Sequence, residues 1–92
     1  MFEQNQELPM RELVRSPNQL GAALRRFRRE RALTQVQLGK RAGLRQGTVS
    51  QVENGLETVR LNTVMDLVRA LDLEVILQPR TKGSEKEIED LF

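Results

Sequence analysis

The stretch from Gly43 to Gly55, GLRQGTVSQVENG, contains few apolar side chains and several amides and hydroxyls. A glutamine amide can donate and accept hydrogen bonds within one plane, and a hydroxyl can do either. Such groups either solvate the surface of a short helix or contact the polar edges of another molecule. The chemistry that this stretch offers is recognition by hydrogen bonding rather than catalysis.

The sequence lacks the side chains on which most catalysis depends. Its 92 residues include no histidine and no cysteine, so the commonest general base, the thiol nucleophile and the usual transition-metal ligands are missing. The sequence contains neither a glycine-rich phosphate loop nor an acidic cluster suited to Mg²⁺. We therefore expect no enzymatic activity and no cofactor.

Size and composition indicate one small domain in a reducing compartment. The N-terminal stretch MFEQNQELPM is polar. No apolar run approaches the roughly 20 residues that a membrane-spanning helix needs. The sequence predicts a cytoplasmic protein that does not contact a membrane.

Charge is distributed unevenly along the chain. The formal net charge is +2, yet residues 16–60 carry nine basic and three acidic side chains, a charge of +6, which leaves −4 for the rest. A basic segment between acidic ends is typical of a domain that binds a polyanion such as nucleic acid. A solvated helix face is the simpler alternative.

Helix-start signals predict the first two helices. Ser16 is placed as an N-cap before Pro17, with Gln19 completing a capping box. Thr34 is a second N-cap, with Gln37 as its partner. Gly43 then ends the second helix, since glycine readily adopts the left-handed conformation found there.

Two further helices follow. The third runs from residue 46 to about 54, without a good N-cap residue before it, and buries Val49 and Val52. The fourth covers residues 61–71, in which the following side chains keep the helical period: Leu61, Val64, Leu67, Val68 and Leu71.

The segment LEVILQP, residues 73–79, predicts a β-strand, because it is rich in branched residues, short and closed by a proline. A lone strand leaves its backbone groups unpaired, and the sequence offers no second strand. We expect pairing with a second copy across a two-fold axis, through Glu74, Val75, Ile76 and Leu77. The alternative is a strand that packs singly against the helices.

The central helices have the spacing of a helix-turn-helix, set by Gln35, Leu38, Gly39, Gly43, Leu44, Val49 and Glu53. The stretch LTQVQLGKRAGLRQGTVSQVENG resembles the Cro and phage-repressor group, also called XRE-like, and the resemblance covers about residues 16–73. More narrowly, RQGTVSQVENG followed by LNTVMDLVRALDLEVILQP is similar to HipB-type antitoxins. Two departures are Gly39, where the family usually has alanine, and Arg45, where many relatives have a capping serine or threonine.

The resemblance implies an all-α, lambda-repressor-like domain of four short helices plus a C-terminal β-strand that pairs across a dimer. This domain would occupy residues 16–79, between an N-terminal arm, 1–15, and a flexible tail, 80–92. It also implies an antitoxin that binds a palindromic operator in double-stranded DNA, represses its own operon and binds a HipA-like serine/threonine kinase toxin. A dimer of this type would place its recognition helices about 34 Å apart.

Two other functions remain open. One is a free-standing XRE-type transcriptional repressor without a toxin partner. The other is a protein-interaction module that has kept the fold and lost DNA binding, although the intact polar face of residues 45–51 argues against it.

The predicted third helix presents one polar face, because residues four apart are neighbours on a helix. Arginine pairs bidentately with guanine and glutamine with adenine in the major groove. The predicted base contacts are therefore Arg45, Gln46, Ser50 and Gln51. The predicted phosphate contacts are Gln35, Thr48 and Asn54, with Arg25 and Arg29 as weaker candidates.

Two further assignments rest on the resemblance. Arg28 and Glu53 match positions at which relatives carry an ion pair, which would join the first helix to the third. Leu91 and Phe92, an apolar pair at the end of a charged tail, would contact the toxin. The alternative for these two residues is a frayed terminus.

Overall fold

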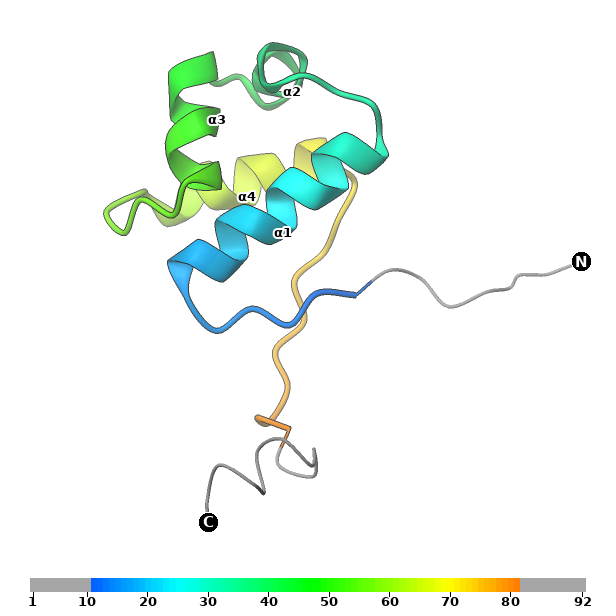
Figure 1. The fold of residues 1–92 in the computed structure, drawn as a ribbon, viewed down its shortest axis with the longest axis vertical. Helices are drawn as coiled ribbons and strands as arrows, with labels where there is room; N and C mark the ends of the chain where they lie inside the picture. The colour runs from blue at the N-terminus through cyan, green and yellow to red at the C-terminus, as the bar shows by residue number, and fades with distance from the viewer. Residues whose placement is uncertain (1–10, 82–92) are drawn as a thin grey trace, which may run out of the picture.

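A computed structural model of the chain describes residues 11–81 (Figure 1). This part is all-α, and its helices are α1 (Pro17–Glu30), α2 (Gln35–Ala42), α3 (Gln46–Glu53) and α4 (Leu61–Ala70). The predicted order of four short helices is confirmed. The predicted toxin contacts Leu91 and Phe92 lie outside the described residues, as do residues 1–10.

The first helix begins at the predicted residue, with one difference in its cap. Ser16 Oγ accepts a hydrogen bond from the backbone N–H of Gln19 at 3.1 Å, and Pro17 occupies the first helical position. The Gln19 side-chain carbonyl, however, accepts from the backbone N–H of Arg15 at 2.5 Å. The prediction that Gln19 returns to Ser16 is wrong by one residue, and the contact ties the end of the arm to α1.

The turn between α2 and α3 needs two glycines for different reasons. Gly43 ends α2 with φ +74°, in the left-handed region. At Gly39, inside α2, a Cβ atom would stand 2.6 Å from the backbone carbonyl oxygen of Leu44. Glycine at position 39 therefore lets the turn lie directly against α2, in return for a weaker helix propensity of about 0.5–1 kcal/mol.

The predicted capping box of α2 is complete. Thr34 Oγ1 accepts from the Gln37 backbone N–H at 3.0 Å, and Gln37 Oε1 accepts from the Thr34 backbone N–H at 2.8 Å. By contrast, Arg45 and Arg60, which precede α3 and α4, make no side-chain cap. The side chain of Arg45 therefore does not cap the first turn of α3.

The core lies where the four helices meet. Its fully buried side chains are Leu38, Val49, Leu67 and Leu71. Val49 and Val52 of α3 point into it, as the sequence indicated. Leu61 keeps the helical period but is 74% exposed, because it is the first residue of α4 and lies beyond the packed face.

Residues 73–81 follow a turn after α4 as an extended segment that crosses the arm (Figure 1). No β-strand is present in residues 11–81. A ladder needs a second strand, so pairing of residues 74–77 across a dimer stays a prediction. No helix in the described range has the length and apolar character needed to cross a membrane.

Candidate nucleic-acid interface

The polar face of α3 points away from the core. Val49 and Val52 are almost completely buried, whereas Arg45, Gln46 and Gln51 are exposed. Ser50 and Thr48 are half-buried on the flanks of this face. Three of the four predicted base-contacting residues are therefore exposed on one short helix and its N-cap, and Ser50 is half-buried beside them.

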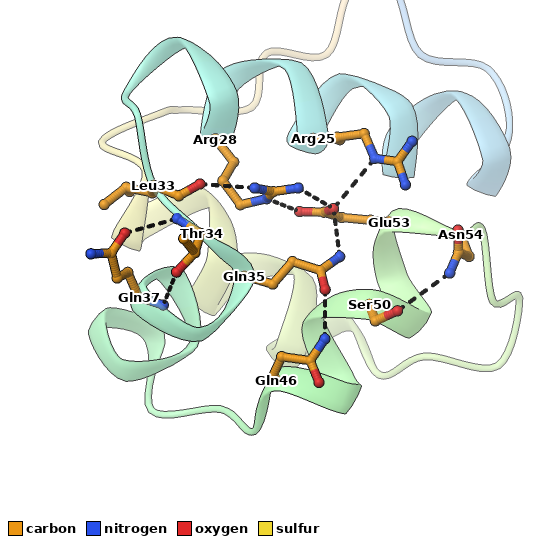
Figure 2. A network of polar contacts seen from close by, with 10 residues as sticks. All are labelled: Arg25, Arg28, Leu33, Thr34, Gln35, Gln37, Gln46, Ser50, Glu53 and Asn54. Carbon is orange, nitrogen blue, oxygen red and sulfur yellow. Dashed lines mark hydrogen bonds and ion pairs between the residues drawn. The ribbon is translucent and has the colours of Figure 1, made fainter.

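The C-terminal end of α3 is held in place through a buried carboxylate, that of Glu53 (Figure 2). Arg28 of α1 donates two hydrogen bonds to this carboxylate, from Nε to Oε2 at 2.6 Å and from Nη2 to Oε1 at 3.0 Å. The third guanidinium nitrogen of Arg28, Nη1, donates to the carbonyl oxygen of Leu33 at 2.8 Å. The structure thus brings together the two residues assigned to an ion pair and joins α1, α3 and the loop before α2.

Opposing effects act on the charge of Glu53. Burial tends to raise the pKa of its carboxyl group, because a low-dielectric surrounding disfavours the charged form. The hydrogen bonds from Arg28 and Gln35, with the positive charges of Arg28 and Arg25, outweigh that effect and leave the pKa below its ordinary value. Glu53 is therefore a carboxylate in the folded chain at neutral pH.

Gln35 links this buried pair to the outward face of α3. Its Nε2 donates to Glu53 Oε1 at 3.0 Å, and its Oε1 accepts from Gln46 Nε2 at 2.6 Å (Figure 2). These bonds set the orientation of both amides, since each uses its nitrogen as a donor. These two bonds do not use Gln46 Oε1 or the second N–H of Gln35 Nε2. Both groups can therefore contact another molecule.

Arg25 occupies a different environment from the one its sequence position indicated. Its Nε lies 3.6 Å from Glu53 Oε1, inside ion-pair distance but outside a good hydrogen bond. That atom is buried, while the side chain as a whole is 42% exposed. Arg25 therefore adds charge to the Glu53 site, and the rest of its side chain extends beside the end of α3 (Figure 2).

The other predicted phosphate contacts lie apart from that network. Asn54 Nδ2 lies 3.4 Å from Ser50 Oγ, a long hydrogen bond on the exposed side of α3. Thr48 is half-buried near the start of the helix. Asn54 is exposed at the end of α3, and Gln35 lies on the neighbouring helix α2.

One residue that positions α3 was not singled out from the sequence. A Cβ atom at Gly21 of α1 would collide with the carbonyl oxygen of Val52 and stand 2.6 Å from that of Glu53. The end of α3 therefore lies directly against the backbone of α1. The signal was a glycine inside an otherwise well-formed helix, a residue with a low helix propensity.

The fold and this face define a helix-turn-helix DNA-binding protein. A family model described as a helix-turn-helix domain matches residues 19–78, which is more than half of the chain. The chain belongs to this family, and within it to the XRE-like group that includes the HipB-type antitoxins.

Among curated proteins, the chain is 30% identical over 76 residues to Antitoxin HipB of Escherichia coli, covering 83% of this chain and 86% of HipB. It is 40% identical over 57 residues to an uncharacterised HTH-type transcriptional regulator of Sinorhizobium fredii, which covers 62% of this chain. The chain spans only 29% of that regulator.

Solved structures show the same fold. A HipB–O4 20mer complex matches with a TM-score of 0.71 at 30% identity, covering 76% of this chain and 99% of HipB. A HipA–HipB–O2–O3 complex matches with the same TM-score, identity and coverage. The overlap therefore extends over nearly the whole of HipB and includes more than the helix-turn-helix itself.

Proposed function

We propose that this chain is the antitoxin of a HipA/HipB-like toxin–antitoxin module. It forms a homodimer that binds a palindromic operator, represses its own operon and binds a kinase toxin. The observation that carries the proposal is the match to Antitoxin HipB along 86% of HipB's length. HipB has been solved with HipA and O2–O3 in one complex.

The base contacts in this proposal come from the outward face of α3, through Arg45, Gln46, Ser50 and Gln51. Gln46 arrives with its amide already oriented by Gln35, so little side-chain entropy is lost when it meets a base edge. Gln35, Thr48 and Asn54 contact phosphates along the edges of the same face. Phosphate contacts make binding weaken steeply with salt, because bound counterions are released.

Operator binding is tested by fluorescence anisotropy with the DNA upstream of the chain's own reading frame. Arg45→Ala and Gln51→Ala should each weaken binding by about 10- to 100-fold, since a bidentate base contact is worth about 1–3 kcal/mol. Arg69→Ala is the matched control, because it removes the same charge from an exposed position near the end of α4, where Arg69 pairs with Asp66. Equal losses in all three variants would show that α3 makes no sequence-specific contact.

Toxin binding is tested separately by affinity capture from the native cell. The full tagged chain is used, with and without nuclease treatment, and the captured proteins are identified by mass spectrometry. A kinase-like protein that remains captured after nuclease treatment supports the antitoxin function.

The tail is tested by removing residues 82–92. This deletion should weaken toxin binding without changing operator affinity if Leu91 and Phe92 contact the toxin. Unchanged toxin binding would overturn that contact.

A free-standing XRE-type repressor is the second candidate. It is favoured by the 40% identity to the HTH-type transcriptional regulator of Sinorhizobium fredii. Capture of DNA alone, with no protein that survives nuclease treatment, would support this function in place of the antitoxin.

A further inference from the structure

Exposed apolar side chains gather in two short segments outside the helices. In the arm, Leu13 and Val14 are both exposed, and in the segment after α4 so are the three residues Val75, Ile76 and Leu77. Leu77 is 93% exposed. Burying apolar surface is favourable by about 25 cal/mol for each Å² removed from water. Two neighbouring exposed apolar runs therefore indicate a surface that binds another molecule.

The arm is fixed to α1 rather than left loose. The carboxylate of Glu12 accepts two hydrogen bonds from Arg26, from Nε at 2.9 Å and from Nη2 at 2.6 Å. Residues 14 positions apart in the sequence are thus joined by a bidentate contact. This contact holds Leu13 and Val14 beside the helix.

The arm also meets the segment after α4. Arg15 Nη2 lies 3.5 Å from Thr81 Oγ1, at the limit of a hydrogen bond. The two segments line one hollow of about 920 Å³, whose floor includes Leu20 and Phe27 of α1. The crossing of arm and segment is visible in Figure 1.

We infer that the arm is a second element of the dimer interface, and that the hollow receives residues 75–77 of a second copy of this chain. This inference rests on the homodimer of the proposed function and extends it from the strand to residues 12–14. A two-fold interface is self-complementary, so each arm covers the partner's segment while its own segment lies under the partner's arm.

Three features favour a second copy over other occupants. The hollow is lined by the same residues 75–77 that are expected to pair across the two-fold axis, so a partner's strand and the hollow are continuous. The apolar part of its lining, which includes Leu20 and Phe27, matches the apolar residues of that strand in kind. Glu12 lines the hollow, and its partner Arg26 is half exposed beside it, as expected of a polar rim around an interface.

The inference is tested by measuring the dimer dissociation constant of the full chain by analytical ultracentrifugation. The arm variant Leu13→Ser with Val14→Ser should raise this constant about 10- to 100-fold, because each lost contact counts twice in a two-fold dimer. Leu61→Ser is the control, since Leu61 is also an exposed apolar side chain but lies on α4 outside the hollow. Circular dichroism of each variant verifies that the helices are intact.

A second variant separates this inference from the homodimer itself. Ile76→Asp places a charge in the strand and should give monomers. If Ile76→Asp dissociates the dimer while the arm variant behaves like Leu61→Ser, the arm has no part in the interface and the inference is overturned, although the dimer stands. If the unaltered chain is monomeric, the dimer and the inference both fail, and the hollow belongs to another occupant, such as residues 82–92 or a different protein.

Discussion

The side of the molecule around Glu53 and the side around the arm differ in how far one chain completes them. Around Glu53, Arg28 and Gln35 satisfy a buried charge from within the chain. Around the arm, polar contacts are made but apolar side chains remain in water. A single chain therefore completes the contacts that hold the end of α3, whereas the apolar side chains of the arm and of residues 75–77 stay exposed.

The largest expected effect on stability comes from removing the buried negative charge of Glu53. Glu53→Gln should lower the free energy of unfolding by on the order of 3 kcal/mol, because it leaves Arg28 buried without a counter-charge. Thermal and urea unfolding measure this. Glu57→Gln, an exposed change of the same chemistry, should stay within about 0.5 kcal/mol. An unchanged melting temperature for Glu53→Gln would show that the Glu53 network does not hold this side together.

The contact of α1 with the end of α3 gives the next effect. Gly21→Ala should destabilise the fold by about 1–3 kcal/mol, since the added methyl group meets backbone carbonyls that cannot move alone. Gly47→Ala is the matched control on the open face of α3, where a Cβ meets no atom within 4 Å. It should raise stability by about 0.5–1 kcal/mol. Equal effects of the two changes, measured by urea unfolding, would contradict the close approach of the helices.

Acidity should affect the two sides unequally. The pKa of Glu53 is lowered in the folded chain, so the unfolded chain binds more protons as pH falls. The stabilisation is present above the unfolded pKa of about 4.3 and is lost as pH falls through the lower, folded pKa. Urea unfolding measured from about pH 6 to about pH 3 should show a steep loss of stability in the unaltered chain and a shallower one in Glu53→Gln.

Glu12 provides the comparison for this pH dependence. Its pKa is also lowered, by the hydrogen bond from Arg26, but the pair is more exposed than Arg28–Glu53 and is screened by water. Glu12→Gln should therefore flatten the pH dependence less than Glu53→Gln does. Equal flattening would remove the distinction between the two sides.

The smallest expected effect concerns the end of α1. Ala32 has φ +57°, a left-handed conformation that costs a residue with a Cβ atom about 1 kcal/mol. Ala32→Gly should raise the melting temperature slightly, with a gain of less than about 1 kcal/mol, since glycine also loses more entropy on folding. A lower melting temperature would mean that the methyl group of Ala32 makes a stabilising contact.

The local features of the fold could be predicted from the sequence, because they depend on residues close together in the chain. The N-caps Ser16 and Thr34, the left-handed Gly43 and the inward Val49 all follow from short-range rules. The exposure of Leu61 did not follow, because periodicity does not show where the neighbouring helices end. The strand at residues 74–77 remains a prediction, since its hydrogen bonds depend on a second chain.

The candidate site was only partly predictable. The residues on the outward face of α3 could be proposed from helix geometry, and the Arg28–Glu53 pair from the family resemblance. The contacts of Gln35 with Glu53 and of Arg26 with Glu12 depend on how distant segments pack. The sequence does not specify such contacts, because a long side chain can reach several partners and only the tertiary fold decides which of them lies near.

Arg26 and Arg28 stand two residues apart in one turn of α1, so they leave the helix from opposite faces, one to Glu12 and the other to Glu53. Arg26 holds the arm through Glu12, and Arg28 holds the end of α3 through Glu53. One helical turn therefore carries both contacts. If a partner that binds the arm shifts this turn and so changes the affinity of α3 for its ligand, thermodynamic linkage requires that ligand to change the affinity of the arm for the partner by the same factor.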